Sequence, residues 1–245
     1  MSTALDRSSL RPYTNARVAL RSAGTSLATS ELLDMALCLA KARDAVHAQL
    51  STITLVPQLA ARSMGVFSVK SAARDRGEYL RRPDLGRRLS SASRQVLEQA
   101  SPEPERLVIV VADGLSAIAA ERHAVPVLDA LLPMLADWQL GSIVVAEQAR
   151  VAIGDEIGEV LKASATLLLI GERPGLSSPD SLGAYITWAP RVGRNDAERN
   201  CISNIRPEGL EYSVAAAKIV QYLNQARRLQ LSGVALKEEP DALRN

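Results

Sequence analysis

Three nearly unbroken apolar runs constrain the fold of this chain most strongly. They cover residues 107–112, 142–146 and 166–170, and none of them contains a charged residue. Stretches with helical spacing lie between them, from about Leu115 onward and over 154–163. Apolar strands that alternate with helices are typical of a parallel sheet with helices on both faces. We therefore predict an α/β fold with a Rossmann-like, mostly parallel sheet, in which 201–205 forms a weaker fourth strand.

The first 100 residues differ from the rest, because their apolar residues follow helical spacing. Residues 31–46 predict one helix, and residues 83–99 predict a second, since Pro83 suits the first turn of a helix. The stiff polar segment 101–104 then indicates a boundary. We predict a helical N-terminal region over 1–100 and a Rossmann-like domain over 101–245, which includes a long Ala-rich helix at 212–229.

The charge balance and the few aromatic residues exclude some classes of function. The 245 residues hold 29 Lys and Arg against 27 Asp and Glu, and aromatic residues make up 3%. Nucleic-acid binders usually carry a basic domain or aromatic platforms for bases, so we expect no nucleic-acid partner. The two cysteines, Cys38 and Cys201, stand far apart, and His47 and His123 are the two histidines. We expect neither a disulfide scaffold nor a protein-held metal site.

No segment predicts export or membrane insertion. Residues 1–14 contain charged residues and lack the apolar stretch of a signal peptide. The charge-free stretch 45–61 is too polar and slightly too short to span a membrane. We expect a cytoplasmic protein without membrane contact.

Four loops are expected at the carboxyl edge of the predicted sheet, where folds of this kind bind ligands. They cover residues 113–114, 147–154, 171–183 and 201–209, and they are rich in Gly, Pro, Ser and Asn. The chain contains no GxGxxG or Walker A sequence, which argues against the alternative of a nucleotide-binding module. Asp113 could contact a ligand, although its position favours a cap of the following helix. Glu172 could accept a hydrogen bond from a ligand amide or form a salt bridge with Arg173 or Arg194.

A free-standing hydrolase or transferase is a second alternative, and it would use Ser177, Asp180 or Cys201. Neither the serine nor the cysteine has a histidine close in sequence to activate it. Asp180 could simply cap the segment that follows it, and a cysteine on a strand is most often a small buried hydrophobe. Activity of the chain alone would support this alternative.

Seven arginines within residues 74–94 allow two interpretations. They form either a solvated helical face or a docking surface, since arginine is favoured where contacts are bidentate. These residues are Arg74, Arg76, Arg81, Arg82, Arg87, Arg88 and Arg94.

Two long blocks are distinctive, at 170–183 (IGERPGLSSPDSLG) and 199–209 (RNCISNIRPEG). With further blocks at 11–20, 42–47, 78–88, 108–116 and 150–158, they resemble one known family, the small (light) subunit of ethanolamine ammonia-lyase. The resemblance reaches from about residue 11 to residue 237. One departure is a leader before Arg11 that is shorter than in some members.

The resemblance implies an essential subunit of an adenosylcobalamin-dependent enzyme, which converts ethanolamine to acetaldehyde and ammonia by radical chemistry. A barrel-shaped large subunit is expected to hold the substrate and the catalytic residues, so none are expected here. The small subunit would pack over the barrel mouth and help to enclose the cobalamin. Cofactor contacts of the family carry over to Val151, Glu172 and Cys201, which the predicted sheet places in strand-end loops on one edge.

The resemblance also bears on assembly and on the state of the cofactor. It favours subunit docking by the N-terminal region and its arginine-rich segment, in a hetero-oligomer of several αβ pairs. The chain lacks the DxHxxG motif of proteins in which a histidine replaces the lower cobalt ligand. Asp44 lies three residues before His47 and not two, and the residue two before His123 is Glu121. The cofactor is therefore expected to keep its own dimethylbenzimidazole on cobalt. Two locations fit the family, the free cytosol and a bacterial microcompartment.

Overall fold

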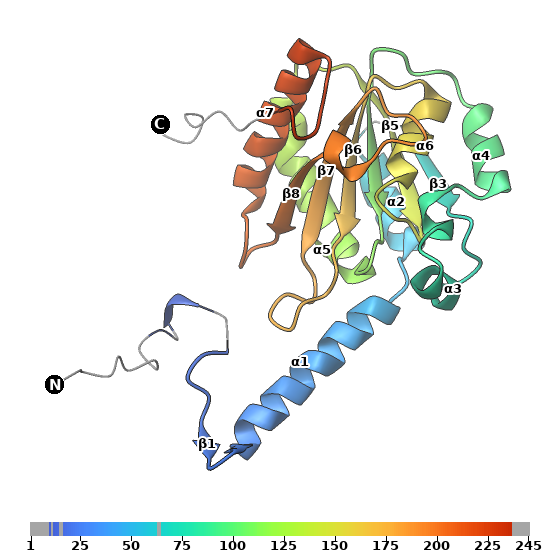
Figure 1. Cartoon of the computed structure of the whole chain (residues 1–245). Helices are drawn as coiled ribbons and strands as arrows, with labels where there is room; N and C mark the ends of the chain where they lie inside the picture. Colours follow the sequence, from blue (N-terminus) through green and yellow to red (C-terminus); the bar gives the residue numbers. More distant parts are fainter. Residues whose placement is uncertain (1–9, 11, 15–16, 63–64, 237–245) are drawn as a thin grey trace.

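A six-stranded sheet forms the centre of the molecule, in a computed structural model that describes residues 10, 12–14, 17–62 and 65–236 (Figure 1). The strand order is β3-β5-β4-β6-β7-β8. The bounds are β3 Val66–Lys70, β4 Leu107–Ala112, β5 Leu140–Glu147, β6 Ala165–Gly171, β7 Leu182–Trp188 and β8 Asn200–Ile205. Neighbours from β3 to β6 pair in parallel, whereas β7 pairs antiparallel with both β6 and β8. The predicted α/β class is confirmed, and the predicted mostly parallel sheet is a mixed one.

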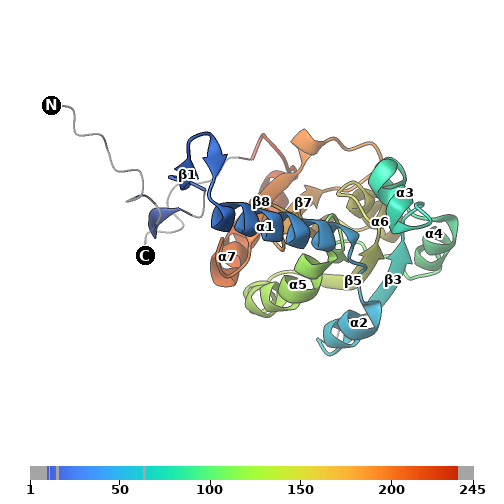
Figure 2. The same ribbon diagram turned by 90° about the horizontal axis from the view of Figure 1, so that it is seen from below.

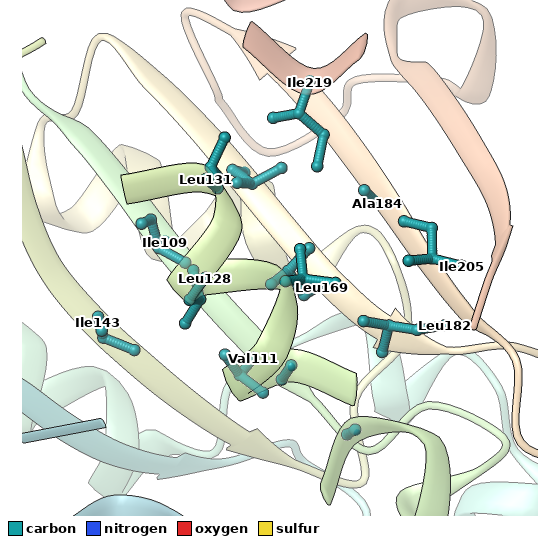
Figure 3. Packing of buried hydrophobic residues seen from close by; sticks show 14 of the residues in the cluster. Ile109, Val111, Leu128, Leu131, Ile143, Leu169, Leu182, Ala184, Ile205 and Ile219 are labelled. Atoms are coloured by element: carbon teal, nitrogen blue, oxygen red, sulfur yellow. The ribbon is translucent and has the colours of Figure 1, made fainter. Parts of the chain in front are cut away.

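Helices cover both faces of the sheet, as its alternating side chains require. One face packs against α2 (Thr52–Ala60), α5 (Ala117–Leu131) and α7 (Tyr212–Leu229), and the other against α4 (Ser91–Glu98) and α6 (Ile153–Leu161). Ile109 and Val111 of β4 face the first cluster, in which Figure 3 shows them beside Leu128, and Val110 faces the second. Burying both faces is what makes the strands continuous apolar runs. Within the described ranges, no helix is both long and apolar enough to cross a membrane.

The N-terminal helix α1 (Thr29–His47) extends away from this body (Figures 1 and 2). A short hairpin precedes it, made of β1 (Ser22–Ala23) and β2 (Ser26–Leu27). The predicted helix over 31–46 is therefore confirmed. Of the helix residues, Ala45 near its C-terminal end is buried.

The predicted second helix over 83–99 is confirmed only in its C-terminal half, which forms α4. A 3-10 turn, η2 (Leu85–Arg87), comes before α4, and a separate short helix, α3 (Arg76–Arg81), ends before Pro83. Asp75 and Ser90 each accept a backbone N–H at the start of a helix, so α3 and α4 begin separately. Pro83 follows the end of α3 and has no N–H with which to continue it. Further 3-10 turns are η3 (Leu132–Met134) and η4 (Asp196–Glu198).

Two strands of the sheet were not predicted from the sequence. Strand β3 lies before residue 101, where the sequence predicted a boundary, and it pairs with β5. The sheet therefore draws residues from both predicted regions, and residues 1–9, 11, 15–16 and 63–64 of the first region lie outside the described part. Strand β7 pairs with β6 over seven residues. Its sequence, LGAYITW, is less continuously apolar than that of β4, because Gly183, Tyr185 and Thr187 interrupt the apolar residues.

Candidate functional site

A pocket of about 440 Å³ opens at the carboxyl edge of the sheet, where β4 and β6 end. Its lining combines the apolar Leu115, Val151 and Ile170 with the polar Glu172 and Tyr185. These residues come from the loop after β4, the loop after β5, the end of β6 and strand β7. The pocket lies where ligand sites occur in open sheets of this kind.

Val151 reaches this pocket from the loop 148–152, which connects β5 to α6. Its side chain is half-buried, and the backbone of the loop is fixed on both sides of it. The N–H groups of Gln148 and Ala149 donate to the carboxylate of Asp113 at 2.7 and 2.9 Å. The N–H of Arg150 donates to the carbonyl of Gly86 at 2.7 Å. Val151 thus offers an apolar contact on a rigid backbone.

Glu172 stands directly after β6 and is held by the neighbouring strands. Its N–H donates to the carbonyl of Ser181 at 2.9 Å, and its Oε2 accepts the N–H of Asn204 at 3.1 Å. Across the described residues, Oε1 accepts no hydrogen bond and Glu172 forms no ion pair, whereas Arg194 pairs with Glu198. The salt bridge that the sequence allowed is therefore not formed with described residues, and one carboxylate oxygen keeps its capacity to accept.

The sequence predicted Cys201 in a strand-end loop, but the residue lies inside β8. There it is directly opposite Tyr185 of β7, and its side chain is exposed with Sγ 3.3 Å from Ser203 Oγ. Burial raises the pKa of Tyr185 above its usual range, and the neighbouring Cys201 and Glu172 raise this pKa further. The structure therefore brings Val151 and Glu172 into one pocket and links Cys201 to it through Tyr185, which the sequence did not indicate.

Asp113 is not the cap of α5 that the sequence favoured. Ser116 takes that role, because its Oγ accepts the N–H of Ala119 at 3.3 Å. Asp113 instead binds the loop after β5 and forms a buried ion pair with Arg76, at 3.1 Å between Nη1 and Oδ2. Burial raises the pKa of Asp113 to about 6, while the N–H groups that it accepts and the charge of Arg76 act in the opposite direction.

Asp180, which the sequence allowed as a simple cap, forms an ion pair with Arg122, at 2.8 Å from a guanidinium nitrogen. Nε2 of His123 lies 3.7 Å from the same carboxylate. The other ring nitrogen of His123 shares a hydrogen bond with the hydroxyl of Tyr212 at 2.8 Å. The histidine that a hydrolase would need is thus close to Asp180, yet its ring binds no serine or cysteine among the described residues. This geometry does not support a nucleophilic site.

Most arginines of the segment 74–94 pair with acidic groups of the chain itself. Arg74 pairs with Glu78, Arg82 with Asp84 and Arg94 with both Glu98 and Glu156. In the described part of the chain, Arg81, Arg87 and Arg88 form no ion pair, and all three side chains are exposed. The intrachain pairs fit the interpretation as a solvated face, and docking by the remaining arginines stays a prediction.

Comparison with known proteins shows the family to which the whole chain is similar. The model of the ethanolamine ammonia-lyase light chain (EutC) matches residues 6–237. The chain belongs to this family. It is 52% identical to the ethanolamine ammonia-lyase small subunit of Azotobacter vinelandii, over 96% of this chain and 89% of that protein. It is 51% identical to the small subunit of Bradyrhizobium diazoefficiens, over 94% of this chain and 89% of that protein.

The family match confirms the resemblance that the sequence blocks indicated. The small subunit of Pseudomonas syringae pv. tomato is also similar, with 51% identity over 94% of this chain and 82% of that protein. The light-chain family is named for one subunit of a lyase, so the chain is part of an enzyme that has a larger partner subunit.

Proposed function

We propose that this chain is the small subunit of an adenosylcobalamin-dependent ethanolamine ammonia-lyase and that it forms one wall of the cobalamin site. The family match over residues 6–237 carries this proposal. The proposed wall is the pocket at the carboxyl edge of the sheet, with Val151, Glu172 and Cys201 as cofactor contacts. The catalytic side chains are assigned to the large subunit.

The residues present fit part of a corrinoid. A corrin ring is a broad apolar surface fringed with amide groups, and the pocket combines Leu115, Val151 and Ile170 with the free acceptor Oε1 of Glu172. A buried amide needs such an acceptor, because an unpaired polar group costs free energy. A pocket of about 440 Å³ covers only a portion of so large a cofactor. A second protein surface has to enclose the rest.

Adenosylcobalamin supplies the radical chemistry when it is bound, and this chain contributes enclosure. Val151 would exclude water from the apolar surface of the ring, and Glu172 would orient a ring amide through Oε1. Cys201, exposed on β8, would add a small contact beside Tyr185. Excluding water protects reactive intermediates from side reactions. No group of this chain is assigned a proton transfer.

The docking surface for the large subunit is placed chiefly on α1. Five of its large apolar side chains are exposed: Leu32, Leu33, Met35, Leu37 and Leu39. Exposed apolar patches on otherwise polar surfaces mark interaction sites. Arg81, Arg87 and Arg88, which form no ion pair with described residues, would add polar contacts to the large subunit.

The first test is co-expression with a large subunit of the family. Acetaldehyde is measured after ethanolamine and adenosylcobalamin are added, with each subunit also assayed alone. Activity that requires both subunits supports the proposal. Activity of this chain alone would contradict it and would return attention to Ser177 and Asp180. A purified stoichiometric complex without activity would contradict the assigned reaction.

The lower cobalt ligand gives a second test. The cofactor is proposed to keep its own dimethylbenzimidazole on cobalt. The enzyme is proposed to assemble from several αβ pairs, in the cytosol or in a bacterial microcompartment. An electron paramagnetic resonance spectrum of bound cob(II)alamin is recorded with nitrogen-15-labelled protein. A superhyperfine pattern that is unchanged by the label supports the proposal. A pattern altered by the label would assign the nitrogen to a protein histidine and contradict it.

A further inference from the structure

The loop 148–152, which carries Val151 to the pocket, holds a conformation that needs support. Gln148 has a φ of +56°, in the left-handed region that side chains other than glycine seldom adopt. Such backbone persists where its surroundings fix it. The support comes from outside the loop: Asp113 accepts two of its N–H groups, and the hydroxyl of Tyr79 donates to the carbonyl of Ala149 at 3.0 Å.

Arg76 completes this support from the other side of Asp113. The side chains of the pair are 7% and 3% exposed. Nη1 of Arg76 also donates to the carbonyl of Gly114 at 2.9 Å, and Nε donates to the carbonyl of Val46 at 2.7 Å. One guanidinium therefore joins the end of α1 to the segment after β4, and through Asp113 it is linked to the loop after β5.

Tyr79 connects the ion pair to the wall of the pocket. Its ring lies between two guanidinium groups, 4.7 Å from Arg76 and 4.3 Å from Arg150. Tyr79 and Arg150 both line the pocket, together with Val151. A buried ion pair is weak as a source of stability, because desolvation offsets much of its attraction. Its position behind a ligand-facing loop suits a second use, which is to fix the groups that face the ligand.

We propose that Asp113 and Arg76 are positioning residues for the cofactor wall: they fix the loop 148–152 so that Val151 and Arg150 face the cobalamin. This inference rests on the proposed function. Neither residue needs to touch the cofactor, since the carboxylate acts through the N–H groups of Gln148 and Ala149. Arg76 acts through the carboxylate, which it keeps charged and aimed at the loop.

The test uses Asp113→Asn in the complex with the large subunit. Hydrogen exchange at the amides of residues 148 and 149 should become faster, since the asparagine amide cannot accept from both. The dissociation constant for adenosylcobalamin, measured by absorbance titration, should rise about tenfold, as it does when groups that support a binding residue are removed. Assembly with the large subunit, followed on a sizing column, should be unchanged.

Asp155→Asn is the matched control, because Asp155 of α6 forms an equally buried ion pair with Arg199, which precedes β8. This variant should leave the exchange of the two amides and the cobalamin affinity unchanged. Tyr79→Phe is a milder variant in case Asp113→Asn fails to fold. It removes one bond to the loop and should raise the dissociation constant about threefold.

The outcomes separate this inference from the function on which it rests. Tight binding of the cofactor by both wild type and Asp113→Asn would overturn the positioning role and leave the proposed function standing. Equal loss of affinity in Asp155→Asn would also overturn it, because any buried ion pair would then have the same effect. A wild-type complex that binds no adenosylcobalamin would overturn both.

Discussion

Two helices of similar composition have opposite surroundings in this molecule. Both α1 and α5 are rich in Ala and Leu, and both carry charged residues between the apolar ones. In α5, eight residues are buried, including Leu128 and Leu131, which pack against the sheet and α7 (Figure 3). In α1, Ala45 alone is buried among the described residues, while Leu33 and Leu37 are 66% and 53% exposed.

This difference separates a body with its own core from a helix for which we propose a partner surface. The sheet and its helices bury their apolar side chains within the chain, so the body has its own core. The large apolar residues of α1 between Leu32 and Leu39 meet no such surface in the described part of the chain. An apolar helix is stabilised mainly by tertiary packing, so α1 points to a surface that a partner supplies.

The largest expected effect is a cavity in the body. Leu128→Ala removes a fully buried side chain of α5, and we expect a loss of about 3 kcal/mol in the free energy of unfolding. Leu37→Ala in α1 is the matched control, for which we expect a change below about 0.5 kcal/mol in the isolated chain. Urea unfolding of the isolated chain measures both values. Equal losses in the two variants would contradict the contrast between the helices.

The second expected effect concerns assembly. A double substitution, Leu33→Gln with Leu37→Gln, removes apolar surface that we expect α1 to bury against the large subunit. If each leucine contributes about 1 kcal/mol, the dissociation constant of the subunits rises about thirtyfold. Titration of the labelled chain with the large subunit measures this constant.

Ile53→Gln controls for a general effect of lost apolar surface, because Ile53 in α2 is also highly exposed. It should leave the affinity between the subunits unchanged. If the double variant assembles like wild type while Ile53→Gln does not, the docking surface lies on the body and not on α1.

The third expected effect is at the pocket. Glu172→Gln keeps the size of the side chain but replaces a charged acceptor by a neutral one, which weakens a hydrogen bond by about 1 kcal/mol. The dissociation constant of the complex for adenosylcobalamin should rise about fivefold. Glu208→Gln, an exposed residue at the same edge, should have no effect. An unchanged affinity in Glu172→Gln would remove Glu172 from the cofactor contacts.

The body was largely predictable from the sequence because its strands are buried on both faces. The predicted strand at 107–112 matches β4, and the strands predicted at 142–146 and 166–170 lie within β5 and β6, which extend further at both ends. Strand β7 was missed, because Gly183 and Thr187 interrupt its apolar pattern. Residues 83–99 were mistaken for one helix, because local capping by Ser90 outweighed the spacing.

The candidate site was predictable only for residues in a loop that directly follows a predicted parallel strand. Val151 and Glu172 follow strands, so the edge rule placed them together. Tyr185 and the Arg76–Asp113 pair were not predictable, since they depend on which strands and helices become neighbours. The exposure of α1 could not be predicted either, because helical spacing indicates an apolar face without showing what covers it.

The smallest expected effect is a dependence of stability on pH that arises in α5. Burial lowers the pKa of His123 below its usual value, although the nearby Asp180 acts in the opposite direction. The unfolded chain therefore takes up a proton near pH 6.5, whereas His123 in the folded chain takes it up at a lower pH. The stability that His123 contributes is complete above that pH and is lost as pH falls toward the lower, folded-state pKa. The slope cannot exceed about 1.4 kcal/mol per pH unit, since one proton is involved.

Urea unfolding of the wild type and of His123→Asn between pH 7.5 and 5.5 isolates this contribution. The wild type should lose stability toward low pH more steeply than the variant, because asparagine takes up no proton in either state. A steeper loss in the variant would mean that Asp180 dominates and that His123 is charged in the folded protein. His123 of α5 would then form an ion pair with Asp180. Helices α1 and α5 would differ in the charges around them as well as in their packing.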